Sequence, residues 1–170
     1  MRIILIGYMG SGKSTMGKKI ARLLNLRFID SDKEISEQFG KSIPELFATE
    51  GEEKFRALEQ SFIRSLPKEE DFVLSTGGGL PCYNHLIEEL NALGTTVYLS
   101  HPVKELVNRL LKSKTKRPII EGKSEEELIA FVTKHLNERI PCYSKAHFTV
   151  PRSISKPAQL LDFIGINQKN

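Results

Sequence analysis

The sequence of 170 residues predicts an α/β fold in which helices flank a parallel sheet of five strands. Short apolar runs alternate along the chain with longer segments that carry apolar residues at helical spacing, which is typical of strands joined by helical crossovers. The first apolar run, residues 3–6, leads directly into a glycine-rich segment and then a helical pattern. The length fits one domain, which we predict to span residues 1–170.

The composition is that of an ordinary globular protein, with 39% hydrophobic and 27% charged residues. No apolar run approaches the roughly 20 residues of a transmembrane helix, and the first run is too short for a signal peptide. Cys82 and Cys142 belong to no metal-binding or C-x-x-C pattern, so we expect free thiols in a reducing compartment. We therefore expect a cytoplasmic protein without a membrane partner, and we expect a monomer.

A phosphate-binding motif occupies residues 7–14, whose sequence GYMGSGKS matches G-x-x-x-x-G-K-[ST] at every fixed position. A glycine-rich turn is the alternative, but the flanking strand and helix patterns favour the motif. Glycines let the backbone fold around phosphate oxygens, and the positive end of the next helix attracts the anion. Lys13 would reach the β- and γ-phosphates of ATP, and the Ser14 hydroxyl would bind Mg²⁺. The ATP-binding residues predicted here are Gly10, Ser11, Gly12, Lys13, Ser14 and Thr15.

Two aspartates end the second predicted strand. Apolar spacing predicts a helix over residues 12–24 and a short strand over 27–30, which runs into Asp30-Ser31-Asp32. Residues two apart in an extended chain point the same way, so both carboxylates should face the edge where open α/β sheets bind ligands. We assign Asp30 to Mg²⁺ through a water molecule and Asp32 to the hydroxyl of a phosphoryl acceptor, although a solvated turn gives the same letters.

Residues 33–66 are predicted to be helical in pieces, with breaks at Gly40 and Gly51. The last piece should bury an apolar stripe made of Phe55, Leu58, Phe62 and Leu66. Arg56 lies beside this stripe. Spacing alone favours a surface arginine paired along the helix with Glu52, Glu59 or Gln60.

Three glycines follow the third predicted strand, residues 72–76. Gly77, Gly78 and Gly79 permit positive φ and a close approach of the backbone to a ligand, although a flexible turn has the same composition. The spacing beyond them predicts a helix, a fourth strand and another helix, at residues 84–93, 95–100 and 103–111.

A basic segment at about 112–124 is predicted to form a lid over the nucleotide, although most charge runs are solvated loops. The planar guanidinium of Arg117 suits a phosphate contact, and Pro118 stiffens the backbone beside it. We expect no nucleic-acid partner, because the segment has no aromatic residue to stack on bases. The net charge of +4 is also spread among acidic residues rather than gathered in one block.

The last part of the chain predicts a helix, a fifth strand at 147–150 and a final helix. A capping box at Ser124 opens the first of these helices. Its apolar face should consist of Leu128, Phe131, Val132, Leu136 and Ile140. Arg139 lies near its end, where the helix dipole favours a cation. Ser155 is a candidate cap for the final helix, and Arg152 is a candidate contact for the nucleotide base.

In order and spacing, these segments resemble the shikimate kinase family, small P-loop kinases of the aromatic amino-acid pathway. The resemblance covers residues 1 to about 165. It rests on the phosphate loop, Asp30-Ser31-Asp32, Phe55-Arg56, Gly77-Gly78-Gly79, Arg117-Pro118 and Arg139-Ile140-Pro141-Cys142-Tyr143. It implies that ATP phosphorylates the 3-hydroxyl of shikimate with Mg²⁺ as cofactor. It also implies a three-layer P-loop kinase fold with an acceptor-binding region at about 32–60 and a lid at about 112–124.

The resemblance adds a role for the two arginines and agrees with the assignments of Asp32 and Arg117. It implies that Arg56 and Arg139 hold the substrate carboxylate, that Asp32 contacts the acceptor hydroxyls and that Arg117 is the lid arginine. The implied catalytic residues are Lys13, Asp32 and Arg117. The implied substrate-binding residues are Asp32, Arg56, Gly77, Gly78, Gly79 and Arg139.

Two other functions remain compatible with the sequence. A small P-loop kinase for a sugar acid or a nucleoside monophosphate would keep the same nucleotide-binding half. A P-loop module that has lost catalysis would bind nucleotide alone, but such a module has no need for an arginine pair that binds an acceptor.

Overall fold

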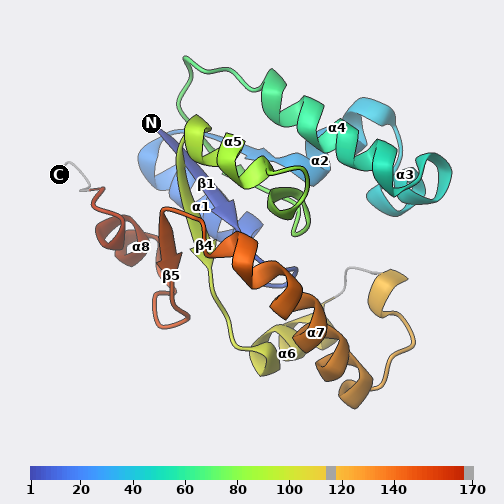
Figure 1. The fold of residues 1–170 in the computed structure, drawn as a ribbon. Coiled ribbons are helices and arrows are strands. Elements are labelled where there is room, and N and C mark those ends of the chain that lie inside the picture. The colour runs from blue at the N-terminus through green and yellow to red at the C-terminus, as the bar shows by residue number, and fades with distance from the viewer. Residues whose placement is uncertain (114–117, 167–170) are drawn as a thin grey trace.

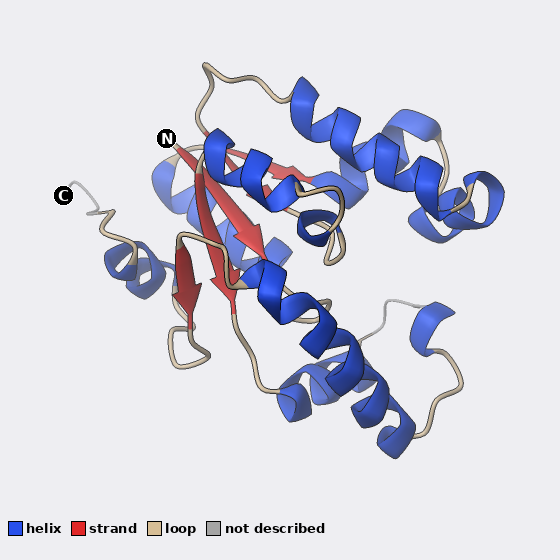
Figure 2. Ribbon diagram, in the orientation of Figure 1, coloured by secondary structure: helices blue, strands red, loops and turns tan. Residues whose placement is uncertain are grey.

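The centre of the protein is a sheet of five parallel strands in the order β2-β3-β1-β4-β5 (Figures 1 and 2). The computed structural model describes residues 1–113 and 118–166. The strands are β1 (Arg2–Ile6), β2 (Arg27–Asp30), β3 (Phe72–Ser75), β4 (Thr95–Leu99) and β5 (Phe148–Val150). Helices cover both faces of the sheet, so the predicted α/β fold with a five-stranded parallel sheet is confirmed.

The helices connect these strands and pack on them (Figure 1). They are α1 (Lys13–Leu24), α2 (Ser31–Phe39), α3 (Ile43–Glu50), α4 (Glu52–Ser65), α5 (Leu86–Leu93), α6 (Val103–Lys112), α7 (Glu125–Tyr143) and α8 (Pro157–Phe163), with short 3₁₀ helices η1 (Leu80–Cys82) and η2 (Pro118–Ile120). Within the described ranges, no helix is both long enough and apolar enough to cross a lipid bilayer.

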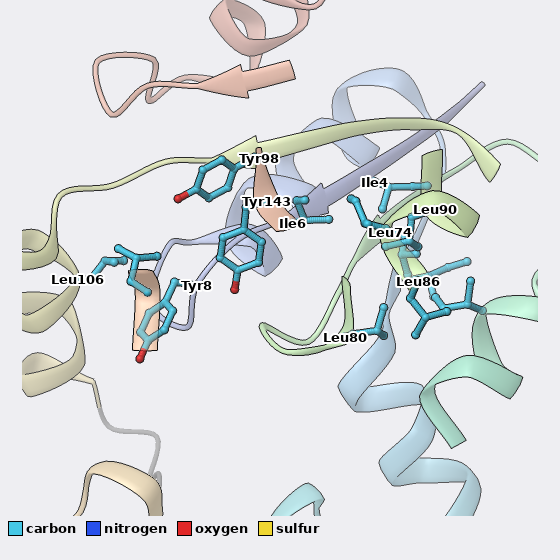
Figure 3. Close-up of a cluster of buried hydrophobic side chains, with 14 of the residues drawn as sticks. Ile4, Ile6, Tyr8, Leu74, Leu80, Leu86, Leu90, Tyr98, Leu106 and Tyr143 are labelled. Carbon is cyan, nitrogen blue, oxygen red and sulfur yellow. The ribbon is translucent and has the colours of Figure 1, made fainter. Parts of the chain in front are cut away.

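Alternation along β1 divides the core into two clusters. Ile4 and Ile6 pack with residues of α4 to α7, whereas Ile3 and Leu5 pack with α1 and α8. All four side chains have an exposed fraction of 0%. A parallel strand covered on both faces needs an uninterrupted apolar run, which explains the sequence of β1. Figure 3 shows the first cluster, with three tyrosines and Leu106 at one end and most of the labelled aliphatic residues at the other.

Between β2 and β3 the chain forms a group of three helices, α2 to α4 (Figure 1). The predicted breaks are confirmed, since Gly40 and Gly51 end α2 and α3 with φ of 63° and 80°. This left-handed backbone favours glycine. A small apolar core of Ile35, Leu46 and Phe55 holds the three helices together.

Three local predictions are wrong. On α4 the apolar stripe is rotated, because Arg56, Glu59 and Ile63 are buried together with Phe55. On α7 Ile140 is 39% exposed, and the buried face of the helix continues instead from Leu136 to Tyr143. The final helix is capped at Lys156 rather than Ser155.

The two cysteines are free thiols, although they are neighbours in space. Cys82 ends η1 and Cys142 lies in the last turn of α7, and their side chains hydrogen bond to each other. The hydrogen bond and burial raise the pKa of the Cys82 thiol. The pair therefore joins the segment after β3 to the end of α7.

The tight approach of Gly94 to β1 predicts a stability effect. A Cβ atom on Gly94 would lie 2.6 Å from the Arg2 carbonyl oxygen, which the pairing of β1 with β3 fixes. We expect Gly94→Ala to lower the free energy of unfolding by about 3 kcal/mol, as overpacking does, in urea denaturation. Gly94 has an extended φ of −176°, so crowding alone causes the loss.

Gly40→Ala is the matched control. Its φ is 63° and its Cβ would meet no atom within 4 Å, so it measures the cost of left-handed backbone alone, about 1 kcal/mol. A loss in Gly94→Ala no larger than in the control would contradict the crowding argument.

Candidate active site

The phosphate loop joins β1 to α1 and folds around the ammonium group of Lys13. The loop turns through Gly10 and Gly12, which have φ of 81° and 89°. Lys13 Nζ donates hydrogen bonds to the carbonyl oxygens of Gly7 at 2.8 Å and Tyr8 at 3.0 Å. The ammonium is thereby held at the N-terminus of α1, where backbone amides and the helix dipole attract phosphate.

Ser14 and Asp30 form an oxygen-rich pair beside the loop. Ser14 Oγ donates to Asp30 Oδ2 at 2.7 Å, and Ser14 Oγ lies 3.2 Å from Ser75 Oγ. Mg²⁺ prefers such oxygen ligands and is usually held by one or two protein groups with water and phosphate. No described group of three or more His, Cys, Asp or Glu side chains is arranged to hold a metal. The hydroxyl of Ser14 and the carboxylate of Asp30 suit a Mg²⁺ ion that also binds phosphate and water.

Asp30 and Asp32 reach the same cavity by a route that differs from the predicted one. The chain is not extended through them, because Ser31 begins α2 and Asp30 caps that helix by accepting from the Lys33 amide at 3.4 Å. Asp32 therefore lies in the first helical turn. The two carboxylates nevertheless line one cavity of about 510 Å³ together with Lys13, Ser14, Gly78 and other loop residues.

The environment of Asp32 raises its pKa above the ordinary value. Burial is the main cause, and the negative charge of Asp30 adds to it, while Lys13 and Arg56 oppose the shift. A carboxylate with a raised pKa accepts a proton more readily, which suits a group next to an acceptor hydroxyl.

Arg56 is buried rather than exposed, with an exposed fraction of 8%, so the surface position predicted from spacing is wrong. Its predicted partners are right. Arg56 Nη1 donates to Glu59 Oε2 at 2.7 Å, and Nη2 donates to Glu52 Oε1 at 3.2 Å. The guanidinium also lies 4.6 Å from the ring centroid of Tyr83. A buried charge needs this pairing, since desolvation alone would be too costly.

Glu59 is a member of the site that the sequence did not reveal. Its exposed fraction is 1%, and burial raises its pKa to about 7 against the opposing effect of Arg56. The nearby charge of Asp32 raises the pKa further. The only sequence signal was its spacing of three residues from Arg56, which many surface pairs share.

The glycine triplet is needed for a different reason from the one predicted. None of the three adopts positive φ. Instead, a Cβ on Gly77 would lie 2.5 Å from Asp32 Oδ1, and one on Gly79 would lie 2.8 Å from both terminal nitrogens of Arg56. A Cβ on Gly78 would lie 3.4 Å from Arg139 Nη1. The missing side chains at Gly77 and Gly79 make room for Asp32 and Arg56, whereas Gly78 only approaches Arg139.

Arg139 comes from α7, whereas Arg56 comes from α4. Its guanidinium carbon lies 5.6 Å from the centroid of the Tyr8 ring. Tyr143, one helical turn further on, donates from its hydroxyl to the Gly78 carbonyl oxygen at 2.6 Å. The end of α7 is thus fixed to the glycine triplet.

A second cavity of about 290 Å³ lies on the other side of the phosphate loop. It is lined by Ser11, Gly12, Thr15, Met16, Lys19, Leu99, His101, Arg109, Val150, Pro151, Arg152, Ile154 and Ser155. Arg152, the predicted base contact, lies here with its Nε paired to Glu105 Oε2. Its position next to the loop suits the base and ribose of a nucleotide.

Arg109 and Glu105 were not predicted for the site. Arg109 Nη1 donates to the carbonyl oxygens of Gly10 and Ser11 at 3.3 Å each, and Nη2 lies 2.6 Å from Glu105 Oε1. The two residues are four apart on α6, a spacing that the sequence shows but that is common on exposed helices.

The lid arginine lies outside the described residues, as do Lys114 and Lys116. The prediction that Arg117 contacts the nucleotide therefore stays a prediction. At the end of the predicted lid, Lys123 Nζ lies 5.4 Å from the centroid of the Phe131 ring on α7.

The sheet order, the phosphate loop and the carboxylates beside it define a nucleotide-binding protein of the P-loop kinase class. A family model described as shikimate kinase matches residues 9–165. The chain therefore belongs to the shikimate kinase family. It is 46% identical over 148 residues to a shikimate kinase of Parabacteroides distasonis, which covers 87% of this chain and 86% of the relative.

Solved structures agree with this assignment. The crystal structure of a shikimate kinase from Bacteroides thetaiotaomicron has a TM-score of 0.92 and 38% sequence identity, with coverage of 97% of this chain and 98% of the other. A shikimate kinase from Acinetobacter baumannii, solved in complex with shikimate, has a TM-score of 0.81 and 35% identity, with coverage of 96% and 89%.

The buried ion pair of Arg56 and Glu59 predicts a large loss of stability on truncation. We expect Glu59→Ala to lower the free energy of unfolding by about 3 kcal/mol, because Arg56 loses its closest partner while it stays buried. Glu89→Ala is the control, since Glu89 pairs with Arg64 at the same 2.7 Å but on the surface. There we expect less than about 1 kcal/mol. Equal losses in urea denaturation of the two variants would contradict the argument.

Proposed function

We propose that the protein is a shikimate kinase, which transfers the γ-phosphoryl group of ATP to the 3-hydroxyl of shikimate in aromatic amino-acid biosynthesis. One observation carries the proposal for the acceptor. The guanidinium of Arg56 lies 2.8 Å from where a Cβ on Gly79 would be, and that of Arg139 lies 3.4 Å from where a Cβ on Gly78 would be. The Asp32 carboxylate adjoins Gly77 of the same triplet. Two arginines beside one carboxylate suit a substrate that carries both an acid and a hydroxyl group.

The acceptor half would work by positioning. Arg56 and Arg139 donate charge-assisted hydrogen bonds to the shikimate carboxylate, which fixes the ring with its 3-hydroxyl towards the phosphate loop. Asp32 accepts the hydroxyl proton as the new O–P bond forms and the bond to the ADP leaving group breaks. The raised pKa of Asp32 supports this role.

The donor half would stabilise charge on the transferred group. Lys13 exchanges its loop carbonyl partners for the β- and γ-phosphates, and Arg117 adds positive charge from the lid. Mg²⁺, when bound, would neutralise phosphate charge, with Ser14 as a direct ligand and Asp30 contacting it through water. Arg109 and Arg152 line the cavity that suits the base and ribose.

The remaining predictions concern the whole chain. We propose a single domain over residues 1–170, in which the region at about 32–60 binds the acceptor and the segment at about 112–124 is the lid. The burial of Arg56 on α4 and the position of Asp32 on α2 support the acceptor region. A cytoplasmic monomer that binds neither nucleic acid nor membrane stays a prediction.

A coupled assay of ADP release tests the function and separates it from its rivals. We expect turnover with shikimate and none with gluconate or nucleoside monophosphates. Turnover with one of those acceptors alone would overturn the choice of substrate. A protein that binds ATP in calorimetry but neither binds shikimate nor releases ADP would instead be a nucleotide-binding module.

Arg139→Ala tests the carboxylate contact. We expect the KM for shikimate to rise about 10- to 100-fold, since a charge-assisted hydrogen bond contributes about 1.5–3 kcal/mol. The KM for ATP should stay close to the wild-type value, because Arg139 approaches Gly78 rather than the nucleotide base cavity. Arg64→Ala, which removes an exposed arginine paired with Glu89, is the control. Unchanged affinity for shikimate in Arg139→Ala would overturn the assignment.

Asp30→Asn tests the metal contact. The amide retains the ability to cap α2, so the fold should persist. We expect the Mg²⁺ concentration for half-maximal activity to rise about tenfold, as when an outer ligand of a metal is lost. Asp162→Asn, on the exposed side of α8, should leave the Mg²⁺ titration unchanged.

The same variant has a second readout. Because the charge of Asp30 raises the pKa of Asp32, its removal should lower that pKa. The acid limb of the kcat/KM profile for shikimate should therefore move to lower pH. A shift to higher pH would contradict the proposed interaction of the two carboxylates.

A further inference from the structure

Tyr8 is the second residue of the phosphate loop, at a position where the motif accepts any residue. Its exposed fraction is 1%, and it is among the largest fully buried side chains of the described residues. Its backbone carbonyl accepts from Lys13 Nζ at 3.0 Å, and its side chain belongs to the first core cluster (Figure 3). Phosphate binding uses the backbone of this residue and leaves the tyrosine ring unexplained.

The ring of Tyr8 contacts Arg139 on one side and His135 at its hydroxyl. The Arg139 guanidinium carbon lies 5.6 Å from the ring centroid, within the range of a cation–π interaction. The Tyr8 hydroxyl lies 3.0 Å from His135 Nδ1, and the two rings meet edge to face with centroids 5.6 Å apart. His135 and Arg139 are four residues apart on α7, so one face of the helix presents both to the loop.

We propose that Tyr8, oriented by His135, is a positioning residue that holds Arg139 in place to bind the carboxylate of the acceptor. This inference rests on the proposed function, in which Arg139 binds the carboxylate. Tyr8 would then connect the two halves of the reaction. Its carbonyl holds the lysine of the donor half, and its ring holds the arginine of the acceptor half.

The charges around the pair support this arrangement. Burial is the main cause that lowers the pKa of His135, and the nearby charges of Arg139 and Arg56 lower it further against Glu138. His135 is therefore neutral near pH 7, and its Nδ1 can accept from the Tyr8 O–H. Burial raises the pKa of Tyr8 to about 12, so the hydroxyl keeps its proton. A neutral ring pair beside Arg139 orients the guanidinium, and it carries no negative charge that would compete with the substrate carboxylate for Arg139.

The contacts continue from His135 along α7. The Phe131 ring lies 5.2 Å from the His135 ring, and Lys123 lies over Phe131 at 5.4 Å. Lys123 belongs to the predicted lid. A row of ring contacts therefore runs from the end of the lid through His135 and Tyr8 to the arginine.

Steady-state kinetics on single variants tests the inference. Tyr8→Leu removes the ring, and we expect it to raise the KM for shikimate about 3- to 30-fold, the range of a cation–π contact. Tyr8→Phe keeps the ring and loses the hydroxyl, so we expect a rise of about 2- to 10-fold, the net value of one hydrogen bond. His135→Leu should match Tyr8→Phe, whereas His135→Asn, with an acceptor oxygen near the place of Nδ1, should restore most of the affinity. The KM for ATP should change little in all four.

Tyr98→Phe is the matched control, because it removes a buried hydroxyl from the same cluster, where that hydroxyl bonds to Ser100. Its KM for shikimate should remain that of the wild type. The double variant Tyr8→Phe/His135→Leu should be no worse than either single variant, since both remove the same bond. If Tyr8→Leu fails to fold, Tyr8→Phe and His135→Leu decide the question.

The outcomes separate this inference from the proposed function. A wild-type protein that does not turn over shikimate overturns the proposed function and this assignment with it. Active variants with lower melting temperatures but an unchanged KM for shikimate overturn the assignment alone and make Tyr8 a structural residue. Equal rises in the KM for ATP and shikimate also overturn it, because they indicate general distortion of the loop.

Discussion

The parallel pairing of β1 with β3 on one side and β4 on the other determines where the functional segments that follow the strands lie. Because all five strands run the same way, the segments that follow them emerge at one edge of the sheet. The segment after β1 is the phosphate loop, and the segments after β2 and β3 are the aspartate pair and the glycine triplet. The segments after β4 and β5 lead to Arg109 and Arg152. Asp32 and the glycine triplet therefore lie on the β2–β3 side of the phosphate loop, and Arg109 and Arg152 lie on the β4–β5 side.

Charge balance decides how the acceptor side is built. Asp32, Arg56 and Glu59 lie within interaction range of one another, and removal of these groups from water disfavours each charge. The positive charge of Arg56 next to the negative charges of Asp32 and Glu59 offsets that cost. The aromatic rings around Arg56 stabilise its charge further. The site is thus a charged network supported by the packing of α2 to α4. Because its groups are already ordered before the substrate binds, binding costs less conformational entropy.

The sequence predicts those parts of the structure that depend only on residues close together in the chain. The strand of residues 3–6, the glycine helix ends and the phosphate loop follow from the residues within each segment. Arg56 shows the limit. Its i+3 and i+4 partners were predictable, but its burial depends on Gly79 and Tyr83, which are distant in sequence. The same holds for the glycine triplet, whose need for small residues comes from side chains on α2, α4 and α7.

The crowding at Gly77 and Gly79 has a consequence for protein engineering. At these two positions the space that a new side chain would fill is already taken by functional carboxylate and guanidinium atoms. Directed evolution towards a different acceptor should therefore accept few substitutions at Gly77 and Gly79. The helices α2 and α4, which carry Asp32 and Arg56, also have half-buried positions such as Glu34 and Leu58. Libraries of variants in those two helices would change the acceptor-binding region and leave the backbone of the phosphate loop unchanged.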